Sequence, residues 1–199
     1  MEKLFSKDMI RRTIYFFLLS IAMIIATFLC VALISPDFDS LFNTLESSST
    51  DRDSNSWERF MAYVVNNSVY VPMQMLIFAL IPIPFLYVIN IAMTSFSVGL
   101  ALYLPMAFAN EELLFSDILI GIVPHFMFEF LGFCIAAALL YKLNKSIIRS
   151  ITNLFRNKKK ENSSILGNVK NFFIGYFVLV FPVLIFAAVI EAFITPLFL

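Results

Sequence analysis

Residues 118–140 read ILIGIVPHFMFEFLGFCIAAALL, and this stretch decides the fold. It is long enough to cross a bilayer, which takes about 20 apolar residues in a helix. The two side chains in it that can carry a charge are His125 and Glu129, and His125 is the only histidine in the chain. A charge at the bilayer centre costs at least about 2.5–3.5 kcal/mol on insertion scales, so we expect both side chains to have partners inside the protein. Their spacing places them on one face of a helix, one above the other.

The composition of the whole chain excludes a soluble globular domain. Hydrophobic residues make up 60% of its 199 residues, and the mean hydropathy is +0.87. Charged residues make up only 14%, against roughly 25% in soluble proteins. We therefore expect an all-α fold: a single polytopic bundle of about five transmembrane helices that occupies residues 1–199.

The apolar runs give the expected boundaries of these five crossings: 13–34, 68–82, 85–108, 118–141 and 171–195. The first run is longer than the 7–15-residue core of a signal peptide, which predicts an uncleaved helix. The run from Ser68 to Ala109 is too long for one crossing and fits two. Pro82 and Pro84 mark the break between them, because proline removes a backbone donor and disfavours continued helix.

Positive charge predicts the orientation. Basic residues precede the first crossing, and the segment 142–170 is also basic. The positive-inside rule places both in the cytoplasm, which requires two crossings rather than one between Ser68 and Ala109. The N-terminus is then cytoplasmic, whereas the acidic loop 36–66 and the C-terminus are external. The expected location is the bacterial plasma membrane.

Two stretches beside the crossings have helical periodicity. Apolar residues from Trp57 to Val64 recur at i, i+3, i+4 and i+7, which predicts a short helix lying in the membrane interface at the end of the external loop. Apolar residues from Leu143 to Phe155 also recur at helical spacing, with basic residues largely opposite. This pattern predicts an amphipathic extension on the cytoplasmic surface that is attracted to anionic lipid headgroups.

Few polar side chains are expected at membrane depth. Apart from Ser, Thr and the aromatic residues, they are Gln74, Asn90, His125, Glu129 and Glu191. From a rise of about 1.5 Å per residue, we expect His125, Glu191 and Gln74 to meet in the outer leaflet. The same estimate places Glu129 and Asn90 together nearer the midplane.

Prolines predicted inside three of the helices free backbone carbonyl groups that also need partners: Pro72, Pro124 and Pro182. The simplest interpretation of the polar cluster is a hydrogen-bond network that holds the helices in register. The alternatives are a path for a solute or proton, and catalysis. Glu129 and Glu191 could activate water between them only if their depths match.

Several chemistries are disfavoured by the residues themselves. A zinc peptidase helix needs His-Glu-x-x-His, and this chain has one histidine, so we expect no metal. No Ser-His-Asp set can be placed at one level, no glycine loop for phosphate is present, and no nucleic-acid signature stands out. The sequence favours a non-catalytic protein without a cofactor and without a nucleic-acid partner.

Four motifs, in order over residues 58–199, resemble the stage II sporulation protein M family of integral membrane proteins. They are Asn66-Asn67, Asn90-Ile91, Pro124-His125-Phe126-Met127-Phe128-Glu129 and Ala188-Val189-Ile190-Glu191-Ala192-Phe193-Ile194-Thr195-Pro196. Ile91 and Phe126 stand where the family tends to have glycine. On this resemblance, Asn66 and Asn67 join the candidate functional residues.

The resemblance also implies a function. Members of the family are similar to a membrane scaffold that works with peptidoglycan-degrading enzymes during forespore engulfment, or to accessory proteins in circular bacteriocin production and export. We therefore expect a scaffold or accessory component whose partners are the lipid bilayer and cell-wall hydrolases or a transport ATPase. The alternative is a transporter or an intramembrane peptide-processing component that uses His125, Glu129 and Glu191. The oligomeric state is left open.

Overall fold

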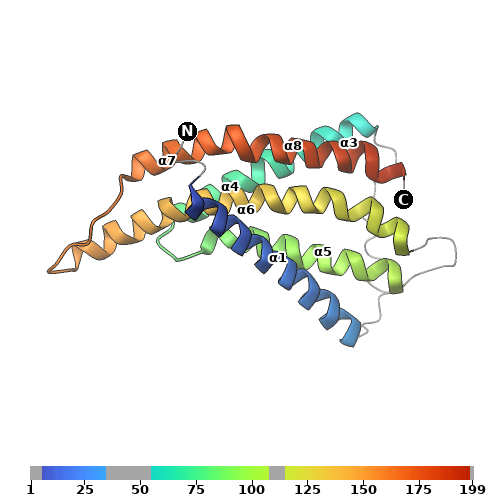
Figure 1. The fold of residues 1–199 in the computed structure, drawn as a ribbon, viewed down its shortest axis with the longest axis horizontal. Coiled ribbons are helices and arrows are strands. Elements are labelled where there is room, and N and C mark those ends of the chain that lie inside the picture. The colour runs from blue at the N-terminus through green and yellow to red at the C-terminus, as the bar shows by residue number, and fades with distance from the viewer. Residues whose placement is uncertain (1–5, 35–54, 108–114, 198–199) are drawn as a thin grey trace.

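The computed structural model describes residues 6–34, 55–107 and 115–197, and these are almost entirely helical. In this part of the chain, five helical segments are long and apolar enough to cross a membrane: Lys7–Ile34, Ser56–Leu80, Leu86–Tyr103, Val123–Leu154 and Ile165–Leu197. They form an elongated bundle (Figure 1). The prediction of an all-α bundle with about five such helices is therefore confirmed. Residues 36–54 of the expected external loop and 110–114 of the expected acidic turn lie outside the described residues.

Three of these segments, Ser56–Leu80, Leu86–Tyr103 and Ile165–Leu197, are built from consecutive helical elements. In chain order the helical elements are α1 (Lys7–Ile34), α3 (Ser56–Tyr63), η1 (Val64–Tyr70), α4 (Val71–Leu80), η2 (Leu86–Val88), α5 (Ile89–Ala107), α6 (Phe115–Leu154), α7 (Ile165–Gly175), η3 (Tyr176–Val180), α8 (Phe181–Val189), η4 (Ile190–Ile194) and η5 (Thr195–Leu197). The elements η1, η3 and η4 are wider π-helical turns, and η2 and η5 are 3₁₀ turns.

Helix α6 lies at the centre of the bundle (Figure 1), where α1, α4, α5, α7 and α8 all pack against it. Of the 18 residues in its most apolar stretch, 56% are buried, whereas only 6% are buried in the most apolar stretch of α1. Phe133, Cys134 and Leu140 on α6 are completely buried. The stretch from which the fold was predicted is therefore the core of the protein, and α1 is left with most of its apolar surface exposed.

Successive long helices run in opposite directions (Figure 1). The start of α1, the turn between α4 and α5, and the connection between α6 and α7 therefore lie at one end, and the C-terminus lies at the other. We call the first the basic end, because it carries these cationic residues: Arg11, Arg12, Lys142, Lys145 and Arg149. The two basic segments share one end, as the prediction of two crossings between Ser68 and Ala109 requires.

One predicted boundary is wrong. The stretch from Trp57 to Val64 is not a separate helix, because α3 continues through η1 into α4 without a break, and the second segment begins at Ser56 rather than at 68. Asn66 and Asn67 lie within η1, where the Asn66 side chain donates to the Asn67 Oδ1 at 2.7 Å. The extension predicted after residue 141 is helical and continues α6, whose 40 residues span about 60 Å.

The predicted break at Pro82 and Pro84 is confirmed, and it is held by a residue on α6. The Asn144 Nδ2 donates to the backbone carbonyls of Ala79, Ile81 and Ile83 at 3.0, 3.0 and 3.2 Å. The end of α4 leaves carbonyl groups without helical donors, and the prolines that follow cannot supply them. The buried Asn144 amide therefore satisfies the end of α4 from a different helix.

The π-helical turns lie just before prolines, because a proline has no N–H and its ring crowds the carbonyl four residues earlier. Turn η1 precedes Pro72, η3 precedes Pro182, and η4 precedes Pro196. The carbonyl that Pro72 cannot bond is that of Ser68, and the Tyr176 hydroxyl of η3 donates to it. This is the kind of partner that the sequence predicted such a carbonyl would need.

The contact between α1 and α5 depends on the absence of a side chain at Gly99. A Cβ added there would lie 2.7 Å from the Thr27 Cβ and 2.8 Å from the Ile24 backbone oxygen. Because backbone cannot move aside as a side chain can, we expect Gly99→Ala to lower the free energy of unfolding by about 1–3 kcal/mol, the usual range for overpacking.

The measurement is the thermal midpoint of the detergent-purified protein. The matched control is Gly167→Ala, whose added Cβ would approach Ser164 no closer than 3.4 Å. Equal midpoints for the two variants would contradict close packing of α1 on α5.

Candidate functional site

Three ionisable side chains meet near the end of the bundle opposite the basic end. His125 and Glu129 come from α6, and Glu191 comes from η4. One ligand atom from each lies within 4.8 Å of the others, and the His125 Nε2 is 3.9 Å from the Glu191 Oε1. His125 and Glu129 are buried, and the Glu191 side chain is 20% exposed. We call these three residues the His–Glu–Glu site.

Two helical faces build the site by the same spacing. His125 and Glu129 are four residues apart on α6, and Glu191 and Thr195 are four residues apart on the last helix. The Thr195 hydroxyl donates to the Gly121 carbonyl at 2.7 Å, which fastens the last helix to α6 one turn before His125. Thr195 belongs to the fourth motif, but its role was not predicted, because nothing in the sequence distinguishes it from the other Ser and Thr residues.

Thr195 also orients the imidazole ring. Its Oγ1 lies 3.4 Å from the His125 Nδ1. Because the hydroxyl hydrogen is directed to Gly121, the oxygen can accept from Nδ1–H in the tautomer that carries its proton there. The Nε2 then faces the carboxylate of Glu191. Such an ordering of one ring nitrogen by a neighbouring acceptor is the usual way in which proteins prepare the other nitrogen for a proton or a metal.

A third helix covers the site. Helix α3 packs on η4, where the rings of Phe60 and Phe193 are 5.8 Å apart. Tyr63 on α3 is close enough to interact electrostatically with both Glu191 and Arg59. The Arg59 Nε is buried without a hydrogen-bond partner. The sequence did not indicate these α3 residues, because it predicted that this stretch would lie in the membrane interface.

The predicted grouping of the polar residues is only partly correct. His125 and Glu191 do meet, but the third residue beside them is Glu129, which was predicted to pair with Asn90, and not Gln74. Gln74 lies elsewhere: the Asn90 Nδ2 donates to its Oε1 at 3.1 Å and to the Val71 carbonyl at 3.5 Å. Gln74 is exposed on α4. It also lies further along the bundle than expected, because the helical segment that carries it begins at Ser56.

Asn66 and Asn67 are also placed outside the site. They bond to one another on η1, where Asn66 is exposed and Asn67 half-buried. The structure therefore divides the predicted cluster into three: the His–Glu–Glu site, the Gln74–Asn90 pair and the Asn66–Asn67 pair.

The His–Glu–Glu site could hold a divalent cation. Because the sequence has a single histidine, we expected no metal, but the fold brings the carboxylates of Glu129 and Glu191 next to the His125 imidazole. Nitrogen and carboxylate oxygen together suit zinc and other first-row metals. Two ionised carboxylates and a dication would sum to zero charge. Without a cation or protons, the two carboxylates would repel one another in a buried setting.

The fold and the site together define a helical membrane protein whose central helix carries a buried histidine and glutamate against a second glutamate from the last helix. The family model for stage II sporulation protein M matches residues 13–196, and the chain belongs to this family. The match includes all three residues of the site. Neither the search of curated proteins nor the search of solved structures found a match.

The attachment of the last helix to α6 can be tested at Thr195. We expect Thr195→Val, which keeps the shape and removes the hydroxyl, to lower the free energy of unfolding in detergent by about 1 kcal/mol, a typical value for a hydrogen bond between membrane helices. The control is Thr94→Val, because the Thr94 hydroxyl bonds within its own helix, to the Asn90 carbonyl at 2.9 Å. If the two variants unfold at the same denaturant concentration, Thr195 does not hold the two helices together.

Proposed function

We propose that this protein is a non-catalytic accessory component of a bacterial plasma-membrane assembly that serves the cell envelope or the export of a circular bacteriocin. The observation that carries this proposal is a hairpin at the basic end, formed by residues 149–166. It joins α6 to α7 and extends beyond the other helices (Figure 1). We call it the basic hairpin.

The tip of the basic hairpin exposes large apolar side chains beside positive charge. Leu154 is 78% exposed and Phe155 is 85% exposed. The residues that follow include Arg156 and the lysine run 158–160, all of them exposed. Apolar side chains rimmed by charge are typical of a surface that binds another protein.

The hairpin is held in a fixed shape, which a docking surface needs. The Asn153 side chain donates to the Lys160 carbonyl at 2.8 Å and accepts from the Lys160 N–H at 3.0 Å. The Asn162 amide donates to the Ser146 carbonyl at 2.9 Å and to the Ser150 hydroxyl at 2.7 Å. A partner would therefore meet an ordered surface and would lose little conformational entropy there on binding.

The basic end would be cytoplasmic by the positive-inside rule. On that orientation the basic hairpin faces a cytoplasmic partner, which favours a transport ATPase over cell-wall hydrolases for this surface. Hydrolases would be met at the opposite end. The family resemblance is in line with both kinds of partner.

The double variant Leu154→Ser/Phe155→Ser tests the proposal. In cells that carry the full chain with an affinity tag, we expect recovery of the transport ATPase, identified by mass spectrometry, to fall roughly tenfold, a loss of about 1.4 kcal/mol of binding free energy. Leu197→Ser is the control, because Leu197 is also 78% exposed but lies at the other end.

Glu129→Gln should leave the recovered partner unchanged, since Glu129 is buried far from the hairpin. The proposal fails if the double variant recovers as much ATPase as the unaltered chain does. It also fails if Leu197→Ser lowers the recovery equally.

A second candidate function is favoured by the convergence of His125, Glu129 and Glu191 within 4.8 Å. We propose that the site takes up a divalent cation or protons and uses them in transport or in intramembrane peptide processing. A bound metal would polarise a carbonyl group or activate a water molecule there. His125 would bind it through Nε2, and Glu129 and Glu191 through their carboxylates.

Metal content separates this candidate from the first. After incubation with Zn²⁺ or Mn²⁺ and removal of free metal, we expect the purified full chain to retain one equivalent, and Glu129→Gln or Glu191→Gln to retain less than roughly a tenth of that, since each variant loses a ligand. Glu161→Gln, at an exposed position, is the control. Equal metal in all four proteins would exclude the metal. Solute flux or peptide cleavage in liposomes that persists in His125→Ala would exclude the function.

A further inference from the structure

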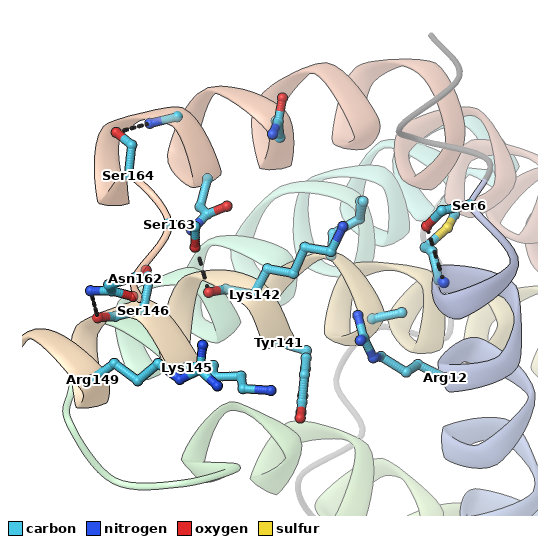
Figure 2. A pocket seen from close by; sticks show the side chains of 16 residues that line it. Ser6, Arg12, Tyr141, Lys142, Lys145, Ser146, Arg149, Asn162, Ser163 and Ser164 are labelled. Carbon is cyan, nitrogen blue, oxygen red and sulfur yellow. Dashed lines mark hydrogen bonds between the residues drawn. The ribbon is translucent and has the colours of Figure 1, made fainter. Parts of the chain in front are cut away.

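A hollow of about 590 Å³ opens at the basic end between α1, α6 and the start of α7 (Figure 2). Four cationic side chains line it: Arg12, Lys142, Lys145 and Arg149. The other polar residues of its wall are serines, asparagines and a tyrosine, and within the described part of the chain no Asp or Glu lines it. We call this hollow the basic pocket. It lies at the other end of α6 from the His–Glu–Glu site and does not depend on either proposed function.

Within the described part of the chain, the cations of the basic pocket have no carboxylate partners. Among the described residues, the ion pairs are Arg11 with Asp8 and His125 with Glu191, neither of which involves the pocket. The Arg149 Nη1 donates only to the Glu161 backbone carbonyl, at 3.2 Å. Cationic groups gathered in one concave site without compensating acids create a local positive potential that attracts an anion.

Arg12 is the strongest indication of a ligand. Its Nη1 is buried, and no described residue accepts a hydrogen bond from it. Its guanidinium carbon lies 4.2 Å from the centre of the Tyr141 ring, and the Lys145 Nζ lies 5.4 Å from the same ring. Figure 2 shows Arg12 and Lys145 on either side of Tyr141. A buried donor left unpaired costs free energy, so an anion that accepts a hydrogen bond from the Arg12 guanidinium would remove this cost.

The wall opposite these cations is also suited to oxygen ligands. Helix α7 starts at the rim of the pocket, where Ser164 caps it by accepting from the Gly167 N–H at 3.2 Å. The start of this 11-residue helix adds the positive end of its dipole. The Asn168 amide, which is buried in the same wall, bonds to the Ser163 hydroxyl and the Lys142 carbonyl.

Apolar residues also line the pocket: Met9, Ala138 and Leu139. We propose that the basic pocket binds a phosphate-bearing anion through Arg12, Lys142 and Lys145. The chemistry it recognises is the phosphate group. A phospholipid would place the start of its acyl chains against the apolar residues, and a soluble phosphate compound would use the cations alone.

The test uses the full chain in detergent and follows its thermal midpoint. We expect short-chain phosphatidic acid to raise the midpoint, and phosphatidylcholine of the same chain length to leave it unchanged. In Arg12→Gln/Lys145→Gln, the concentration of phosphatidic acid that gives half of the effect should rise at least roughly tenfold. Lys158→Gln/Lys159→Gln removes the same charge outside the pocket and should respond as the unaltered chain does.

Three outcomes overturn the proposal. The first is that neither phosphatidic acid nor pyrophosphate shifts the thermal midpoint. The second is an equal loss of response in the Lys158→Gln/Lys159→Gln control, which would mean diffuse surface charge. The third is an equal shift with phosphatidylcholine.

A shift with pyrophosphate alone that Arg12→Gln/Lys145→Gln abolishes would support the site and identify the source as a soluble phosphate. Should that variant fail to fold, Lys142→Gln replaces it. Lys142 is exposed and lines the pocket, so its loss removes a ligand contact without removing a packed side chain.

Discussion

Helix α6 packs against α1, α4, α5, α7 and α8, and this one constraint governs where its polar groups can find partners. In an apolar surrounding, a polar group that is not satisfied within the protein costs several kcal/mol. His125 and Glu129 are met by the last helix, and Asn144 is met by the end of α4. The residues that break the apolar run of α6 are thus the residues that fasten other helices to it.

The hydrogen bonds and the ion pair between α6 and its neighbours lie near its two ends. Near one end, Thr195 and Glu191 join it to the last helix. Near the other, Asn144 holds the proline turn between α4 and α5. Between them the helix is joined to its neighbours largely by packing, through small and aromatic side chains such as Ala136 and Phe133, which are fully buried. The bundle is therefore specified by hydrogen bonds near both ends and largely by shape in the middle.

The sequence correctly predicted the features of the fold that depend on local residue patterns. Run length predicted five apolar helices, Pro82 and Pro84 predicted the break, and charge predicted that the two basic segments share an end. It failed where a position depends on a distant boundary: Gln74 was expected near His125 because the second apolar segment was predicted to begin at Ser68, twelve residues after its actual start at Ser56. It gave no sign of the role of Asn144, because the carbonyls that this amide satisfies come together only in the folded protein.

The positions of these contacts along α6 also bear on the candidate functions. A path for a solute across the membrane would need polar groups at successive depths, yet the 15 residues that separate Glu129 from Asn144 cover about 22 Å of helix. The side chains of Phe133, Cys134, Ala137 and Leu140 in that interval are fully buried and apolar. The His–Glu–Glu site is thus separated along α6 from the basic pocket. This favours a local role for the buried acids, in structure or in chemistry at one level. The basic end, where we propose partner and phosphate binding, is a separate surface.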